Sequence, residues 1–221
     1  MRKVLQICCD RYEIEDRLAE YLPDLDYKLE GEYLQYTLTF LDVTEEESCD
    51  IDSLFEDEAY NNDEMKLAEM LVALAQECGK RISTAESCTG GMVASAIVDI
   101  PGCSEVFLEG LVTYSNQAKR DRLGVSEDTL DKYGAVSAET AVEMANGLLA
   151  QGADIGLSVT GIAGPDGGTK DKPVGLVYIA VVSEKQSDVY RNILKGDRNS
   201  VRRQTANLAM FYTIQHLKNN F

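Results

Sequence analysis

The sequence of 221 residues predicts an α/β fold, in which a mainly parallel, layered sheet carries helices on both faces and ends in one antiparallel hairpin. From residue 64 onward, apolar segments of strand length alternate with longer segments of helical periodicity, and this alternation is typical of a parallel sheet. Residues 174–182 and 189–194 are strand-like segments separated by a short polar turn, which indicates the hairpin. The first 63 residues differ in composition and predict a small additional α+β unit.

Residues 1–63 are predicted to form an acidic βαββ-like appendage that ends in a linker. They hold 19 acidic and 5 basic side chains, a net charge of −14, whereas the rest of the chain has a net charge of −3. Residues 42–63 are strongly acidic and are interpreted as the linker. The elements expected before it are a strand, a helix and a hairpin, at residues 4–9, 13–21, 27–29 and 34–40. No motif indicates what this appendage does, and its role is left open.

Residues 64–221 are predicted to form the main domain. Its first helix is expected to end at Gly79, and Ser137 is a plausible N-cap for a later helix that has Glu139 in its first turn. The hairpin is followed by a long final helix. The expected helices cover residues 67–78, 92–98, 138–149 and 199–217, and the expected strands before the hairpin cover residues 81–84, 106–114 and 155–160.

The net charge of −17 argues against nucleic acid or an anionic membrane surface as a partner, because phosphate groups bind to lysine and arginine. A small anionic substrate is compatible with this charge if a few cations converge locally. No apolar segment approaches the ~20 residues that a membrane helix needs, and the first residues do not resemble a signal peptide. A cytoplasmic location is therefore expected. A homo-oligomer such as a dimer, with subunit contacts made by the acidic appendage, is also considered.

The six cysteines form no C-x-x-C pair and no metal-binding spacing with histidine, so reduced thiols and no metal or cofactor are expected. The only histidine is His216, near the C-terminus. It is expected at the surface or as a cap of the last helix. A catalytic Ser-His-Asp triad is therefore not expected.

Three loops that follow predicted strands could converge at one edge of the sheet, at residues 86–91, 114–119 and 160–168. The first is a strand-to-helix turn containing Ser87, Thr89, Gly90 and Gly91. Such a turn directs free N–H groups and the positive end of a helix dipole toward a phosphate or an oxyanion. Alternatively, its hydroxyls only cap the helix and its glycines permit the tight entry. The turn alone leaves both interpretations open.

A serine nucleophile in this chain needs a base other than histidine. Lys119 is the candidate, because burial would lower the pKa of its ammonium and leave a neutral amine that can accept a proton. Tyr114 could relay or donate that proton. In the alternative interpretation, Lys119 is a solvated helix residue and Tyr114 belongs to the core. The third loop has neither the Walker A nor the dinucleotide-binding spacing, and it is either a crossover or a backbone cradle for a ring or a phosphate.

Taken together, these loops resemble the CinA C-terminal domain family over about residues 64–219. The resemblance is carried by five blocks in the family's order, at residues 84–91, 112–119, 133–137, 161–168 with 172–175, and 196–198 with 201–203. It implies hydrolysis of the carboxamide of nicotinamide mononucleotide to nicotinate mononucleotide and ammonia, in pyridine nucleotide recycling. The family's proposed serine, tyrosine and lysine fall on Ser87, Tyr114 and Lys119.

The substrate would be a small nucleotide held around this site. The residues expected to bind it are Glu86, Thr89, Gly90, Gly91, Asn116, Gly161, Gly164, Pro165, Asp166, Arg198 and Arg202. Two other functions are considered: a nucleotide-binding or regulatory module without turnover, and an amidase for another small amide. Longer family members carry a large molybdopterin-binding-like domain before this one. Residues 1–63 are too short for that domain, so no pyrophosphatase activity is expected.

Overall fold

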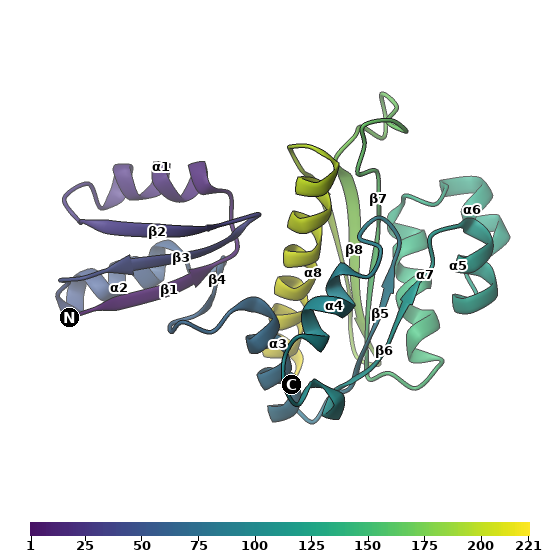
Figure 1. The fold of residues 1–221 in the computed structure, drawn as a ribbon, viewed down its shortest axis with the longest axis horizontal. Coiled ribbons are helices and arrows are strands. Elements are labelled where there is room, and N and C mark those ends of the chain that lie inside the picture. The colour runs from purple at the N-terminus through teal and green to yellow at the C-terminus, as the bar shows by residue number, and fades with distance from the viewer. The chain divides into compact units, whose positions relative to one another are not determined.

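The computed structural model describes all residues from 1 to 221, and the chain divides into two compact units, Met1–Met70 and Leu71–Phe221 (Figure 1). The boundary falls inside helix α3 (Leu67–Glu77). None of the helices is both long enough and apolar enough to cross a lipid bilayer.

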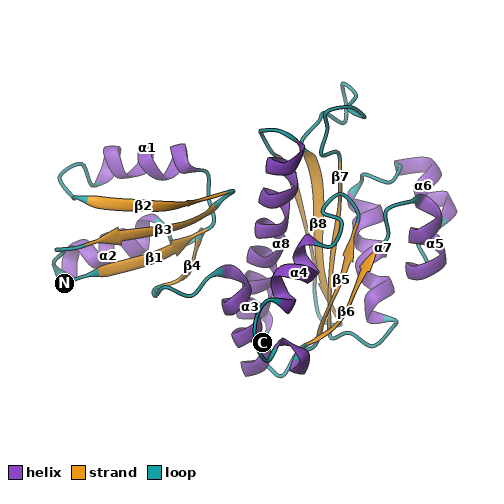
Figure 2. Ribbon diagram, in the orientation of Figure 1, coloured by secondary structure: helices purple, strands orange, loops and turns teal.

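The N-terminal unit is a four-stranded antiparallel sheet with two helices (Figure 2). Its strands have the order β2-β3-β1-β4, and β1 pairs with β3 so that Leu5 lies opposite Leu38. Both helices contribute to the same apolar core as the sheet, through residues such as Ile14 and Ile51. The elements are β1 (Lys3–Ile7), α1 (Arg11–Tyr21), β2 (Tyr27–Glu32), β3 (Gln35–Phe40), α2 (Glu45–Leu54) and β4 (Ala59–Asn61).

The structure corrects the interpretation of residues 42–63 as a linker, because this segment contains α2 and β4. Helix α2 begins with a capping box, in which Thr44 and Glu47 satisfy each other's backbone N–H groups. Ile51 and Phe55 are fully buried in the core of the unit. The acidic side chains thus occupy the solvent-facing side of a folded helix, and the few apolar residues among them fix it to the sheet.

The second unit is a five-stranded sheet of order β6-β5-β7-β8-β9. Strand β5 is parallel to both β6 and β7, whereas β8 is antiparallel to both of its neighbours, so only β8 runs in the opposite direction. The expected mainly parallel sheet and its terminal hairpin are confirmed. The strands are β5 (Ile82–Glu86), β6 (Phe107–Val112), β7 (Ile155–Gly161), β8 (Leu176–Ser183) and β9 (Ser187–Ile193). The helices are α4 (Met92–Val98), a short 3₁₀ turn η1 (Cys103–Glu105), α5 (Asn116–Leu123), α6 (Glu127–Tyr133), α7 (Ala138–Leu149) and α8 (Arg198–Asn220).

Helices cover both faces of this sheet, as Figure 1 shows: α4 and α8 lie on one side and α7 on the other. The small residues Ala141 and Ala145 of α7 pack on Ala180 and Val182 of β8, which allows the helix to approach the sheet closely. The connection after β5 passes through α4, whereas the connection into β7 passes through α7 on the opposite face. The carboxyl ends of β5 and β7 therefore lie at a topological switch point, where open α/β sheets bind ligands.

His216 is not a surface or capping residue, contrary to expectation. It is 1% exposed, because α8 packs its buried face on β7 and β8. Its Nδ1 lies 2.6 Å from Asp188 Oδ2, and its Nε2 lies 3.0 Å from Ser183 Oγ. The chain thus contains a Ser-His-Asp arrangement at the hairpin, formed by residues that are 28 and 33 positions from the histidine.

Candidate functional site

Ser87 and Lys119 meet at the carboxyl end of β5. The Nζ of Lys119 lies 3.0 Å from the Oγ of Ser87, although the two residues are 32 positions apart in the chain. Ser87 is placed by its backbone, whose N–H donates to the carbonyl of Val159 in the neighbouring strand β7 at 3.0 Å. Lys119 is placed by α5, whose N-cap Ser115 accepts from the N–H of Ala118. The expected pairing of this serine with this lysine is thus present as a direct contact.

Lys119 has no counter-ion, although its side chain is fully buried. Its ammonium donates to three oxygens: the Ser87 hydroxyl, the carbonyl of Thr113 at 2.8 Å and the carbonyl of Tyr114 at 3.2 Å. Burial removes water from the charged form and lowers the pKa of Lys119 from 10.5 to about 8. A substantial fraction of this lysine is therefore a neutral amine in mildly alkaline solution, as a general base requires.

A cavity of about 230 Å³ opens beside this pair. All three predicted loops line it, together with the turn at residues 133–137, which holds none of the expected substrate-binding residues. The lining residues are Ser87, Cys88, Tyr114, Lys119, Ala135, Val136, Thr160, Gly161, Ala163 and Arg198. The ends of β5 and β7 thus frame a pocket with a serine–lysine pair in its wall and mostly apolar or backbone groups around it.

Tyr114 lines the cavity but is 64% exposed, so it is not a core residue. It contacts Lys119 through its backbone carbonyl and not through its phenol. The phenol oxygen lies 3.5 Å from the guanidinium of Arg198. In this conformation the proton path between Ser87 and Lys119 is direct and does not pass through the tyrosine.

Glu86 is a structural anchor and does not line the cavity. It is 1% exposed, and its carboxylate accepts the backbone N–H groups of Gly91 at 2.9 Å, Val93 at 3.2 Å and Ala94 at 2.8 Å. Helix α4 begins after Gly91, which has a left-handed φ of 94° and no side chain with which to cap the helix. The carboxylate of Glu86 therefore caps the N-terminus of α4. Because it binds the Gly91 N–H, this N–H is not available to a ligand.

Two of the three arginines near the start of α8, Arg198 and Arg202, have different partners. Arg198 lines the cavity and donates to the carbonyl of Gly164 at 2.7 Å, which connects the helix to the third loop. Arg202 does not line the cavity, because its guanidinium binds the carbonyls of Cys88 and Thr89. Of these two arginines, only Arg198 is thus placed to meet an anionic group in the pocket.

Several of the expected substrate-binding residues lie outside the cavity wall. Pro165 and Asp166 are exposed on the third loop, and Asn116 forms the first turn of α5. The turn that contributes Ala135 and Val136 is held by Lys172, whose Nζ donates to the carbonyls of Tyr133 and Val136. Ala135 and Val136 have no reactive side chains, so although residues 133–137 are one of the blocks that carry the family resemblance, the sequence did not indicate that these two residues line a pocket.

Cys88 lies next to Ser87 and also lines the cavity. Burial raises the pKa of its thiol to about 12, so the thiol stays protonated. Because the thiolate is the reactive form of cysteine, Cys88 does not compete with Ser87 as a nucleophile.

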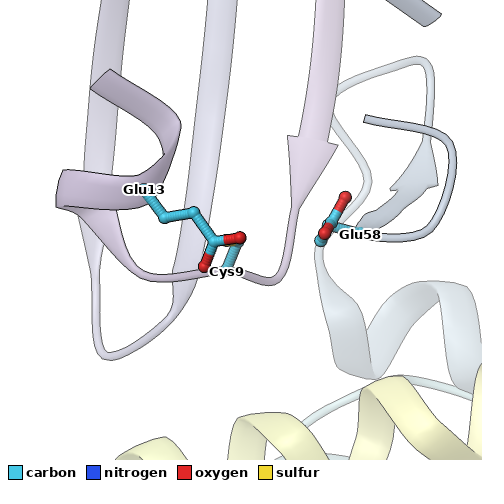
Figure 3. A group of neighbouring side chains, drawn as sticks. All are labelled: Cys9, Glu13 and Glu58. Atoms are coloured by element: carbon cyan, nitrogen blue, oxygen red, sulfur yellow. The ribbon is translucent and has the colours of Figure 1, made fainter. Parts of the chain in front are cut away.

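One cluster in the N-terminal unit has the composition of a metal site: Cys9, Glu13 and Glu58 have ligand atoms within 4.8 Å of one another (Figure 3). The guanidinium of Arg17 forms salt bridges with both glutamates. Burial raises the pKa of the Cys9 thiol to about 12, with a further contribution from its hydrogen bond to Glu13. A protonated thiol and two carboxylates already paired with arginine are a poor ligand set for a cation.

A model of the CinA C-terminal domain family matches residues 64–217. A CinA-like protein of Kosmotoga olearia is 54% identical over 152 residues, which are 68% of this chain and 37% of that protein. A putative competence-damage inducible protein of Clostridium beijerinckii is 46% identical over 192 residues, which are 85% of this chain and 46% of that protein. That 85% is more than residues 64–221 alone could supply, so the alignment also includes part of residues 1–63. The chain spans less than half the length of these two curated relatives.

Two solved structures resemble the second unit closely. The competence/damage inducible protein CihA of Agrobacterium tumefaciens has a TM-score of 0.66 and 41% sequence identity, and the match covers 69% of this chain and 93% of that chain. A CinA superfamily protein of Klebsiella pneumoniae has a TM-score of 0.67 and 35% identity, and the match covers 69% of this chain and 96% of that chain. The chain belongs to the CinA family, and residues 64–217 are its CinA C-terminal domain.

Proposed function

We propose that this protein hydrolyses the carboxamide of nicotinamide mononucleotide to nicotinate mononucleotide and ammonia. The observation that carries the proposal is the buried, unpaired Lys119 with its Nζ 3.0 Å from the Ser87 hydroxyl, in the wall of a cavity. A lysine of this kind has little structural purpose, because burying an ammonium without a counter-ion costs stability. As a base for serine, the same lysine is useful, because its lowered pKa brings the neutral amine into the working pH range.

The reaction begins when neutral Lys119 takes the proton of the Ser87 hydroxyl and the serine oxygen attacks the amide carbon. The carbonyl oxygen becomes an oxyanion, which is stabilised by backbone N–H groups of the loop after Ser87. The C–N bond then breaks, and the nitrogen leaves as ammonia with the proton that Lys119 had accepted. Water hydrolyses the resulting Ser87 ester, with Lys119 accepting a proton from the water and returning it to the serine oxygen.

The remainder of the substrate would lie along the third loop. Gly161 and Ala163 present backbone and small side chains to the cavity, which suits a flat pyridine ring. Arg198 is the arginine in the cavity wall and, because Lys119 serves as the base, it is our candidate for contact with the phosphate. The Arg198 guanidinium donates to the backbone carbonyl of Gly164 and is not paired with a carboxylate. Its positive charge is therefore available to a phosphate.

The test is ammonia release from nicotinamide mononucleotide by the wild-type protein and by Ser87→Ala. We expect turnover by the wild type and a loss of several orders of magnitude in kcat for Ser87→Ala, because the nucleophile is removed. Ser95→Ala is the matched control, since Ser95 is an exposed residue of α4 and lies outside the cavity wall.

Three outcomes would contradict parts of this proposal. Equal activity of the wild type and Ser87→Ala would exclude Ser87 as the nucleophile. Binding of the nucleotide in calorimetry without ammonia release would indicate a binding or regulatory module. Release of ammonia from other small amides, but not from this nucleotide, would retain the mechanism and exclude the substrate.

A further inference from the structure

Arg202 contacts the loop after Ser87 from the side of α8. Its Nε donates to the carbonyl of Cys88 at 3.1 Å, and its Nη2 donates to the carbonyl of Thr89 at 2.8 Å. The two ends of this contact are more than 110 positions apart in the chain. A guanidinium has its donors in a fixed plane, so two bonds from one arginine fix the orientation of both peptide groups.

The orientation of these two peptides determines where their N–H groups point. In a trans peptide, the carbonyl of one residue and the N–H of the next lie on opposite sides of the bond. The carbonyls of Cys88 and Thr89 point toward Arg202, so the N–H groups of Thr89 and Gly90 point away from it. The Thr89 N–H is hydrogen-bonded to the neighbouring Cys88 thiol, whereas the Gly90 N–H donates no hydrogen bond to the protein.

The far end of the loop is fixed by a different residue. The N–H of Gly91 is bound by Glu86, so it belongs to the start of α4. Gly90 has a φ of +63°, and a Cβ placed on it would lie 3.4 Å from Nη2 of Arg202. Arg202 thus packs directly against the backbone of the loop, and the glycine leaves room for it.

We propose that Arg202 is a positioning residue that holds the N–H group of Gly90 toward the oxyanion of the reaction at Ser87. This inference rests on the proposed serine mechanism and specifies which part of the loop stabilises the charge. Two of the donor nitrogens of Arg202 are used by backbone carbonyls, and its side chain is outside the cavity wall. Arg202 therefore acts through the loop and not by binding the phosphate of the substrate.

Two substitutions separate these roles. Arg202→Lys retains the positive charge but loses the planar fork, whereas Arg202→Gln loses both. Arg191→Lys is the matched control, because Arg191 is an exposed residue of β9 that makes no contact with the loop. We expect both Arg202 variants to lower kcat for nicotinamide mononucleotide by roughly tenfold to a hundredfold with KM within about twofold of the wild type, since misplaced catalytic groups cost this much.

Nicotinamide riboside, which has the amide but no phosphate, provides the discriminating comparison. A positioning role predicts the same fold-loss in kcat/KM for the riboside and the mononucleotide. A loss confined to the mononucleotide, or one found in KM alone and restored by Arg202→Lys, would overturn the inference in favour of phosphate binding.

A fluorophosphonate probe keeps this test independent of the substrate, because its reaction with serine also places negative charge on an oxygen near the loop. We expect Ser87 to be labelled in the wild type and labelled at least about tenfold more slowly in both Arg202 variants. If the wild type is labelled but releases no ammonia from the nucleotide, the proposed substrate fails while the labelling rates still decide the role of Arg202. Wild-type labelling rates in the Arg202 variants, or no labelling of Ser87 in any protein, would overturn the inference.

Gly90→Ala tests the same contact without changing α8. Its new methyl group would crowd Nη2 of Arg202 and strain a left-handed backbone position, so we expect slower labelling of Ser87 here too. Thermal unfolding of each variant identifies any that does not fold. If the Arg202 variants fail to fold, the labelling rate of Gly90→Ala decides, and a wild-type rate would contradict the positioning role.

Discussion

Lys119 donates its hydrogen bonds only to neutral oxygens, and this environment determines how its charge responds to pH. The carbonyls of Thr113 and Tyr114 and the hydroxyl of Ser87 surround the ammonium, and no carboxylate pairs with it. Burial therefore dominates and lowers the pKa of the amine to about 8. Below this pH most of the lysine is protonated, and only the remaining neutral fraction can accept the proton of Ser87.

We predict that kcat/KM for nicotinamide mononucleotide rises about tenfold per pH unit below pH 8 and levels off above it, because only the neutral amine acts as the base. The measurement is the initial rate of ammonia release between pH 6 and 9.5. Lys119→Arg is the control, since a guanidinium stays charged over this range and should leave the protein inactive throughout. A flat profile across pH 8 would contradict the assignment of Lys119 as the base.

The sequence was informative about Ser87 and Lys119 because their loops follow consecutive parallel strands, whose carboxyl ends meet at one edge of the sheet. It was not informative about Glu86 and Arg202, which we expected to bind substrate. Glutamate and arginine are common in ligand sites, but the same residue types also cap helices and bind backbone carbonyls. Their partners depend on how α4 and α8 pack, and no local pattern describes that packing.

At the scale of single elements, Glu86 connects the end of β5 to the start of α4. We predict that Glu86→Gln lowers the free energy of unfolding by roughly 2–3 kcal/mol, because an amide cannot accept all three N–H bonds and loses the charge that strengthens them. The midpoint of urea unfolding would measure this loss. Glu77→Gln is the control at an exposed helix position and should change stability by at most about 0.5 kcal/mol. Equal midpoints for the two variants would show that the cap is not needed for stability.

Most helices and strands of the second unit follow from periodicity, and the hairpin of β8 and β9 lies where the sequence predicted it, but the short helices α5 and α6 were not predicted. His216 shows the limit of such reasoning. It is the only histidine of the chain, and nothing in the sequence around it indicated that it would be buried against Ser183 and Asp188. The buried face of a long helix can be read from its apolar residues, but the polar partners of a side chain on that face belong to other elements.

At the scale of the whole molecule, the two units differ in charge, in sheet type and in the presence of the candidate site. All residues of the cavity wall belong to the second unit. About 69% of this chain matches 93% and 96% of the two solved relatives. Those solved chains are thus folded without a counterpart of the other part of this chain. In residues 42–63 the abundance of acidic side chains concealed α2, because charge alone does not distinguish a solvated helix from a linker.

We predict that the fragment 64–221 folds and keeps kcat/KM within about threefold of the full chain, because it contains every residue of the proposed mechanism. Ammonia release by the fragment, with circular dichroism as the check on folding, is the measurement. A folded fragment that is inactive, while the full chain is active, would show that the N-terminal unit contributes to the site.

The most direct test of the central claim is the location at which a fluorophosphonate probe modifies the protein. The chain offers two serines beside a base: Ser87 with Lys119, and Ser183 with His216 and Asp188. Our account predicts that peptide mass mapping finds the label on Ser87, and that Lys119→Met slows the labelling by at least about a hundredfold because the base is removed. A label on Ser183, or equal labelling of Ser87 in Lys119→Met, would contradict it.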